Sequence, residues 1–112
     1  MAYRIDINLS VRTLTLYQDG AAIRQYPVGI GKPSTPTPAG DFAIGEKAIV
    51  TDPRFGTRWM GLSGTNGVGI HGTYNDFSVG QAMSNGCIRM HIADAQQLYD
   101  LVSVGTPVII RR

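Results

Sequence analysis

Apolar and polar residues alternate along most of this 112-residue chain, and this period of two constrains its fold more than any other feature. Residues 3–9 alternate strictly, and residues 14–16 and 23–30 continue the pattern on either side of an Asp19-Gly20 turn. Fourteen glycines and six prolines interrupt the pattern at turns. We therefore predict a mainly β fold of the β-rich α+β class, built as a small sandwich or folded sheet.

Helical spacing of apolar residues occurs only near residues 92–102, which predicts one main helix. Asp94 would lie in its first turn, where the helix dipole favours a negative charge. Gly105 and Pro107 are expected to end the helix. No internal repeat or linker is visible, so residues 1–112 are predicted to form a single domain.

Composition and charge argue against several functional classes. Ten basic and eight acidic residues give a net charge of +2 without a basic stripe, so we expect no nucleic-acid binding. No apolar stretch approaches the roughly 18–20 residues that a membrane span requires. The first residues alternate like a strand, so no signal peptide is expected. A lone cysteine, Cys87, allows neither an internal disulfide nor a cysteine-based zinc site.

Two segments, residues 69–73 and 84–90, combine glycines with reactive side chains. In an extended strand Gly69 and His71 point to one face while their apolar neighbours point to the core. We therefore expect open space for a substrate beside the His71 ring. By the same alternation, Cys87 and Arg89 share a face, and the glycine-rich connection between the segments could bring thiol and imidazole together.

A neighbouring thiol and imidazole are the elements of nucleophilic catalysis, because an imidazolium lowers a thiol's pKa from its free value of about 8.5. Other interpretations remain open from the residues alone. A lone Cys87 can be a small core residue, His71 a hydrogen-bonded scaffold, and Arg89 a surface ion-pair partner. A metal site of His71, Cys87 and His91 is disfavoured, since no carboxylate stands at ligand spacing and His91 is expected at the helix start.

These same residues carry a resemblance to a known family. Ile70-His71-Gly72-Thr73, followed by Ser84-Asn85-Gly86-Cys87-Ile88-Arg89-Met90, resembles the L,D-transpeptidase catalytic domain, the YkuD-like family of bacterial cell-wall enzymes. Residues 35–42 resemble the family's upstream loop, and residues 56–62 resemble the segment before the histidine strand. The resemblance covers nearly the whole chain in order and implies mixed sheets in a sandwich-like fold.

The resemblance also implies a mechanism. Cys87 would attack the bond between an L-centre diamino acid and D-Ala in a stem tetrapeptide, with His71 as base, oriented by a carbonyl near Gly72. Backbone N–H groups of Gly86 and Cys87 would hold the oxyanion. D-Ala would leave, and an amine of another stem peptide would resolve the thioester to give a 3-3 cross-link.

Further roles are implied for neighbouring residues, and for partners and location. Arg89 would meet a substrate carboxylate, and the other substrate-binding residues would be Ser84, Asn85, Trp59 and Thr73. Many members carry histidine at the position of Asn85. The resemblance implies no metal or cofactor, covalent inhibition by carbapenem-type β-lactams, and an extracytoplasmic site of action at the cell wall. An L,D-carboxypeptidase hydrolysing the same bond, or a catalytically silent wall-binding module, remains an alternative.

Overall fold

The computed structural model describes residues 2–112 and contains one α-helix, α1 (Ile92–Leu101), and two short 3-10 helices, η1 (Pro53–Phe55) and η2 (Asp76–Ser78). No helix among residues 2–112 is both long and apolar enough to cross a membrane. The remaining regular elements are the strands β1 (Tyr3–Asn8), β2 (Thr13–Gln18), β3 (Ala21–Pro27), β4 (Ile30–Gly31), β5 (Gly40–Ile49), β6 (Arg58–Ser63), β7 (Gly69–Thr73), β8 (Ala82–Ser84), β9 (Ile88–His91) and β10 (Pro107–Arg111).

Eight strands form one sheet in the order β3-β2-β1-β10-β5-β6-β7-β9, and β4 pairs with β8 in a separate ribbon. Within the large sheet, β1 runs parallel to β10 and β7 runs parallel to β9. The other neighbouring strands are antiparallel. The prediction of a mainly β fold with mixed sheets and one main helix is therefore confirmed.

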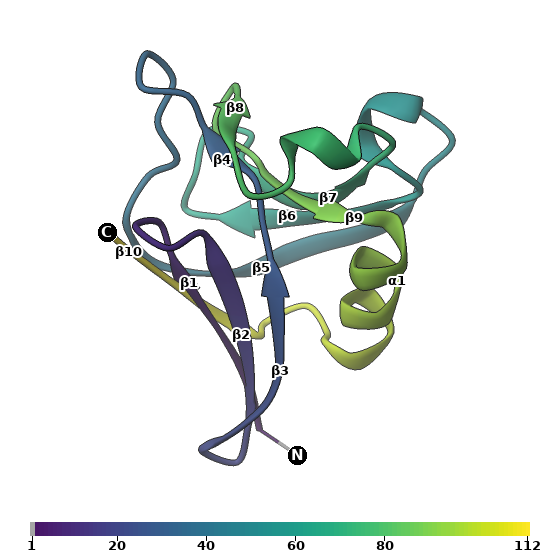
Figure 1. Ribbon diagram of the computed structural model, residues 1–112. Helices are drawn as coiled ribbons and strands as arrows, with labels where there is room; N and C mark the ends of the chain where they lie inside the picture. Colours follow the sequence, from purple (N-terminus) through teal and green to yellow (C-terminus); the bar gives the residue numbers. More distant parts are fainter. Residues whose placement is uncertain (1) are drawn as a thin grey trace.

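The long strand β5 joins the two halves of the sheet. Its residues 40–43 pair with β10, and its residues 43–49 pair with β6. The register shifts between Ile44 and Glu46, and such a bulge bends a strand and increases its twist. In Figure 1 the β1–β2 hairpin and β10 accordingly run at a steep angle to β6, β7 and β9.

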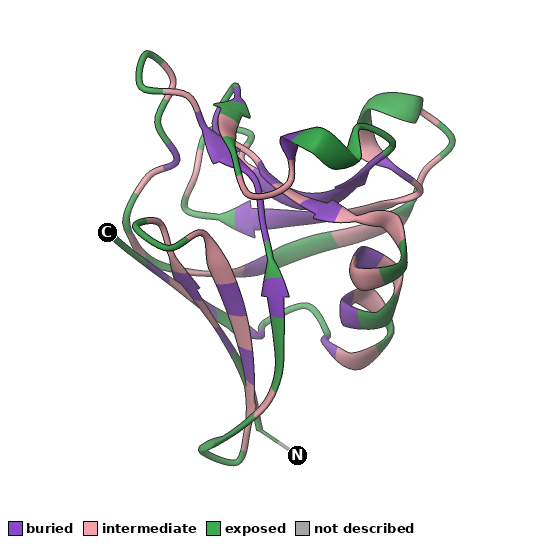
Figure 2. Cartoon of the chain, in the orientation of Figure 1, coloured by how far each residue is buried: buried purple, intermediate pink, exposed green. Residues whose placement is uncertain are grey.

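Inward-facing side chains of both halves form one continuous hydrophobic core. Ile5, Ile7, Leu14 and Leu16 are completely buried, as the alternation of β1 and β2 predicts (Figure 2). Helix α1 packs against β6, β7 and β9 through buried residues that include Leu98. Fully burying a side chain of this size stabilises the fold by about 1.5–3 kcal/mol.

Helix α1 ends where its apolar spacing predicts, to within one residue, but by a different device. Its last residue is Leu101, and Val102 has left the helical conformation well before Gly105 and Pro107. The Nζ of Lys47, on β5, donates to the carbonyl oxygens of Tyr99 and Val102 at 2.7 and 2.6 Å. A positive charge at the carboxyl end of a helix is favourable, so a lysine from the sheet caps α1.

Candidate active site

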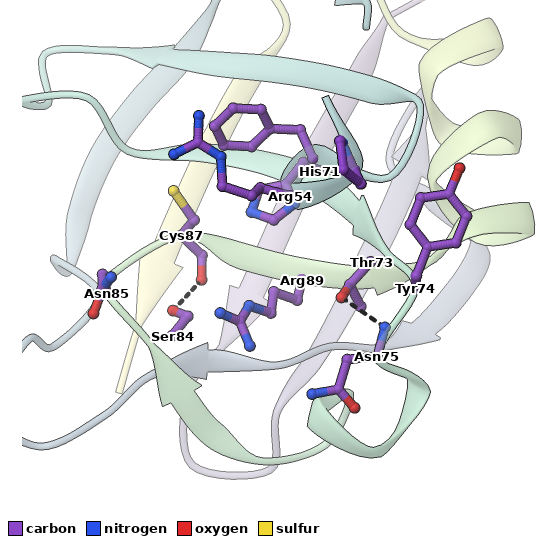
Figure 3. A pocket seen from close by; sticks show the side chains of 11 residues that line it. Arg54, His71, Thr73, Tyr74, Asn75, Ser84, Asn85, Cys87 and Arg89 are labelled. Atoms are coloured by element: carbon purple, nitrogen blue, oxygen red, sulfur yellow. Dashed lines mark hydrogen bonds between the residues drawn. The ribbon is translucent and has the colours of Figure 1, made fainter. Parts of the chain in front are cut away.

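The parallel pair β7–β9 determines which residues face the site. Its register aligns Ile70 with Ile88 and His71 with Arg89. Ile70 and Ile88 are fully buried in the core, so the alternation of a strand places His71 and Arg89 on the other face. Cys87 immediately precedes β9, and Figure 3 shows it on this face, around the same cavity as His71 and Arg89. The expected juxtaposition of the two glycine-flanked segments is confirmed.

A cavity of about 510 Å³ opens on this face. It contains five of the predicted side chains besides Cys87: those of His71, Arg89, Ser84, Asn85 and Thr73. The remaining lining residues are Pro53, Arg54, Phe55, Tyr74 and Asn75, from η1 and from the segment after β7.

His71 is buried and held by one hydrogen bond. Its Nδ1 lies 2.7 Å from the carbonyl oxygen of Gly72. A carbonyl oxygen can only accept, so Nδ1 carries the proton and Nε2 is the basic nitrogen. The predicted orientation of the ring by a carbonyl near Gly72 is present in the structure.

Burial lowers the pKa of His71 below its ordinary value, the hydrogen bond to Gly72 opposes this shift, and the positive charge of Arg89 adds to it. The imidazole is therefore neutral near pH 7. This differs from the expectation of an imidazolium beside the thiol: a neutral ring can take the thiol proton as a general base, but it does not act as a resting counter-ion.

Two aromatic rings pack against His71. The Trp59 ring stacks on the His71 ring with centroids 5.9 Å apart, and the Phe55 ring meets it edge-on at 5.3 Å. A Cβ atom at Gly69 would lie 2.4 Å from the nearest ring atom of Trp59. The absence of a side chain at Gly69 thus makes room for the indole, whereas the open space expected beside His71 is the cavity that it lines together with Cys87.

Trp59 therefore contacts the His71 ring but is not among the residues that line the cavity with Cys87. It lines a second cavity, of about 320 Å³. Trp59 thus borders a cavity next to the one that the thiol lines, and its role in substrate binding stays a prediction. Gly72 and Gly86 contribute backbone only and are not among the lining residues of the first cavity.

The turn before Cys87 is fixed by Ser84. The Ser84 Oγ accepts a hydrogen bond from the Gly86 N–H at 3.0 Å and donates to the Cys87 carbonyl oxygen at 2.7 Å. Gly86 adopts φ +124°, a conformation that residues with a Cβ rarely adopt. The serine and the glycine together determine how the backbone presents the thiol.

The glycine- and proline-rich loop of residues 29–40 holds the same turn from the outside. The Thr37 Oγ1 donates to the carbonyl oxygen of Gly86 at 2.8 Å, and the Thr35 Oγ1 donates to that of Ser84 at 2.9 Å. The Nζ of Lys32 donates to the Asn85 Oδ1 at 2.9 Å. Asn85 is therefore already bonded to a cation at the rim of the cavity.

The backbone N–H groups of Gly86 and Cys87, both expected to hold an oxyanion, differ in whether they already donate a hydrogen bond. The Gly86 N–H is taken by the Ser84 Oγ. The Cys87 N–H has no acceptor within residues 2–112 and is free to donate. Only Cys87 thus offers the free donor that was expected from both residues.

The cavity is positively charged. Among its lining residues, Arg54 and Arg89 are cationic and none carries a carboxylate. Arg54 pairs with Asp52 at 2.7 Å, whereas Arg89 has no ion-pair partner within residues 2–112. Arg89 is therefore the unpaired cation available to an anionic ligand.

His91 lies at the N-cap of α1, as predicted, and not in this cavity. Its Nδ1 lies 2.7 Å from the Asp76 carboxylate, at the exposed surface. His71 is consequently the imidazole that shares the cavity with Cys87.

The family model of the L,D-transpeptidase catalytic domain, YkuD, matches residues 2–110 of the chain. The chain belongs to the L,D-transpeptidase catalytic domain family. The family resemblance seen in the motifs is thereby confirmed.

Proteins named L,D-transpeptidase YkuD from Bacillus licheniformis and Bacillus subtilis are 44% and 41% identical over 96% and 98% of this chain. The chain spans 65% and 66% of the lengths of these relatives. An L,D-transpeptidase solved in complex with imipenem matches with a TM-score of 0.84 at 27% identity, over 98% of this chain and 59% of that one.

Several residues of this L,D-transpeptidase-family domain were not singled out from the sequence. Phe55 packs on His71 from η1, and Thr37 bonds to the carbonyl of Gly86 from the distant loop. The signals for them were a Pro-rich loop, whose residues 35–42 resemble the family's upstream loop, and a polar segment interrupted by glycine and proline at residues 51–58. Their contacts depend on tertiary structure, which local patterns do not specify.

Proposed function

We propose that this domain is a peptidoglycan L,D-transpeptidase that uses Cys87 as its nucleophile. One observation carries the proposal: the Cys87 thiol shares a cavity with His71, whose Nδ1 is bound to a carbonyl so that Nε2 is the basic nitrogen. A neutral imidazole in this tautomer can take the thiol proton as the sulfur attacks. Membership of the family supports the same assignment.

In the first half-reaction the Cys87 sulfur attacks the carbonyl that joins an L-centre diamino acid to D-Ala. The thiol proton passes to the Nε2 of His71, and the free N–H of Cys87 stabilises the negative charge that develops on the carbonyl oxygen. The C–N bond then breaks, His71 returns the proton to the departing amine of D-Ala, and a thioester remains on Cys87. The pKa of His71, lowered by burial, favours the neutral ring that this step needs.

In the second half-reaction a neutral amine of another stem peptide attacks the thioester. The new C–N bond forms as the C–S bond breaks, and one proton of the amine passes through His71 to the sulfur. The product is a 3-3 cross-link. Arg89 would bind the carboxylate of the donor peptide, since it is the unpaired cation of the cavity.

Ser84 would position the turn before Cys87, and Thr73 would line the first cavity. Asn85 would shape the rim of the same cavity. Trp59 would act through His71, on which it stacks. We place the reaction outside the cytoplasm, at the cell wall, where stem peptides occur. Carbapenems would acylate Cys87, a proposal supported by the related enzyme solved with imipenem.

The test is a product analysis by mass spectrometry. The protein is incubated with a purified disaccharide-tetrapeptide ending in D-Ala, and we expect D-Ala together with a 3-3 cross-linked dimer. The variant Cys87→Ala should form neither product, because it lacks the nucleophile. Release of D-Ala with a linear tripeptide alone would indicate an L,D-carboxypeptidase, and the absence of any product from the unaltered chain would favour a silent wall-binding module.

A further inference from the structure

Cys87 lies between two cavities. Its side chain lines the first, and its sulfur is 3.9 Å from the carbonyl oxygen of Gly67, a residue that lines the second. Trp59, which stacks on His71, also lines the second cavity. A carbonyl group bound to the Cys87 sulfur would therefore be close to both spaces.

The two cavities differ in charge. Arginines line the first, without a carboxylate, whereas Glu46 is the only charged residue among those that line the second. Neither lysine nor arginine pairs with Glu46 within residues 2–112, so its charge is not compensated by the protein. An anionic group is favoured in the first cavity and a cationic group in the second.

The carboxylate of Glu46 is held in place by the surrounding structure. The Trp59 Nε1 donates to its Oε2 at 3.3 Å, which orients the carboxylate against the indole. Gly61 lies directly opposite Glu46 in the β5–β6 register. A Cβ at Gly61 would come within 2.7 Å of the Glu46 side chain and 3.0 Å of the Trp59 Nε1, so a glycine is needed beside this pair.

We propose that the second cavity binds the acceptor of the transfer reaction as a primary ammonium, and that Glu46 is the residue that selects it. The inference rests on the proposed function and names its second substrate by charge. A carboxylate beside an aromatic ring is a favourable environment for an ammonium group. Before attack the ammonium loses one proton to solvent, and the Gly67 carbonyl, beside the Cys87 sulfur, can accept a hydrogen bond from the resulting amine.

Binding is measured without any reaction. Trp59 is the only tryptophan of the chain, so its fluorescence reports ligands in this cavity. Nα-acetyl-lysine amide serves as the cationic probe, and the alcohol analogue of the same length serves as the neutral probe. We expect the unaltered protein to bind the cationic probe more tightly than the neutral one.

Glu46→Gln keeps an acceptor for the Trp59 Nε1–H but removes the charge. We expect it to raise the Kd of the cationic probe about three- to five-fold, the range of an exposed ion pair, and to leave the Kd of the neutral probe unchanged. The difference should shrink at 1 M salt. Asp41→Asn is the matched control, because Asp41 is an exposed carboxylate of the same strand that lines neither cavity.

Equal binding of the cationic probe by Glu46→Gln and Asp41→Asn, or no binding by the unaltered protein, would overturn the proposal. A loss of affinity that also affects the neutral probe, or that persists at 1 M salt, would mean that Glu46 has a merely structural role. In cross-linking assays the same variant should raise the KM for the lysine-type acceptor. These results are independent of D-Ala release from the donor, whose absence would count against the proposed function instead.

Discussion

Replacing Gly69 by alanine tests the packing that holds His71 in place. The new Cβ would lie 2.4, 2.7 and 2.7 Å from three atoms of the six-membered ring of Trp59. The indole cannot stay where it is, and it stacks on the His71 ring. Overpacking of this kind typically costs about 1–3 kcal/mol, so Gly69→Ala should lower the free energy of unfolding by that amount.

The sign of the effect should reverse when the indole is removed. In a Trp59→Leu background the ring atoms that meet the Cβ are gone. Alanine is then favoured over glycine within a strand by roughly 0.5–1 kcal/mol, since it loses less backbone entropy on folding. The coupling between the two positions should therefore be about 1.5–4 kcal/mol, the sum of these two effects.

The assay is urea unfolding of all four proteins of this double-mutant cycle, followed by far-ultraviolet circular dichroism. The single tryptophan adds a second signal, because the fluorescence of Trp59 should change in folded Gly69→Ala. A stability loss of equal size in both backgrounds would refute the reasoning. So would an unchanged stability and fluorescence in the single Gly69→Ala variant.

Three further results are expected. Because burial lowers the pKa of His71, the unfolded chain binds more protons than the folded one just below pH 6.5. The free energy of unfolding, measured by urea titration, should therefore fall as the pH drops through this region. The fall should be smaller in His71→Asn, which lacks the titrating group. Lys47→Met removes the cap of α1 and should cost about 1.5–3 kcal/mol of stability, measured in the same way; no loss would mean that the cap is not needed. Because the neutral His71 ring is the base that takes the thiol proton, His71→Ala should slow iodoacetamide alkylation of Cys87 near neutral pH, whereas His91→Ala should not. The reverse result would mean that the wrong base has been chosen.

Much of the fold could be predicted from the sequence because burial follows local alternation. Ile5 and Ile7 of β1 are buried as their period of two indicates, and the helix begins at Ile92 as its apolar spacing indicates. The contact that caps the end of that helix could not be predicted. It depends on Lys47, more than fifty residues away along the chain, and no local pattern announces such a contact.

In the candidate active site, too, some features follow from the sequence and others depend on tertiary contacts. The faces of His71 and Arg89 follow from strand alternation and the family motif, and the structure agrees with both. The ring of Trp59 beside Gly69 could not be predicted, since a glycine indicates only that some group approaches closely. The charge state of His71 was also not visible from the sequence, because it depends on burial.

The central claim is that Cys87 carries the acyl group during transfer. It is tested most directly by intact-mass measurement of the protein after rapid mixing with the donor disaccharide-tetrapeptide alone, followed by peptide mapping. We expect a transient mass increase equal to the donor minus D-Ala, located on the peptide that contains Cys87 and absent from Cys87→Ala. An adduct on another residue, or D-Ala release by Cys87→Ala, would contradict the account.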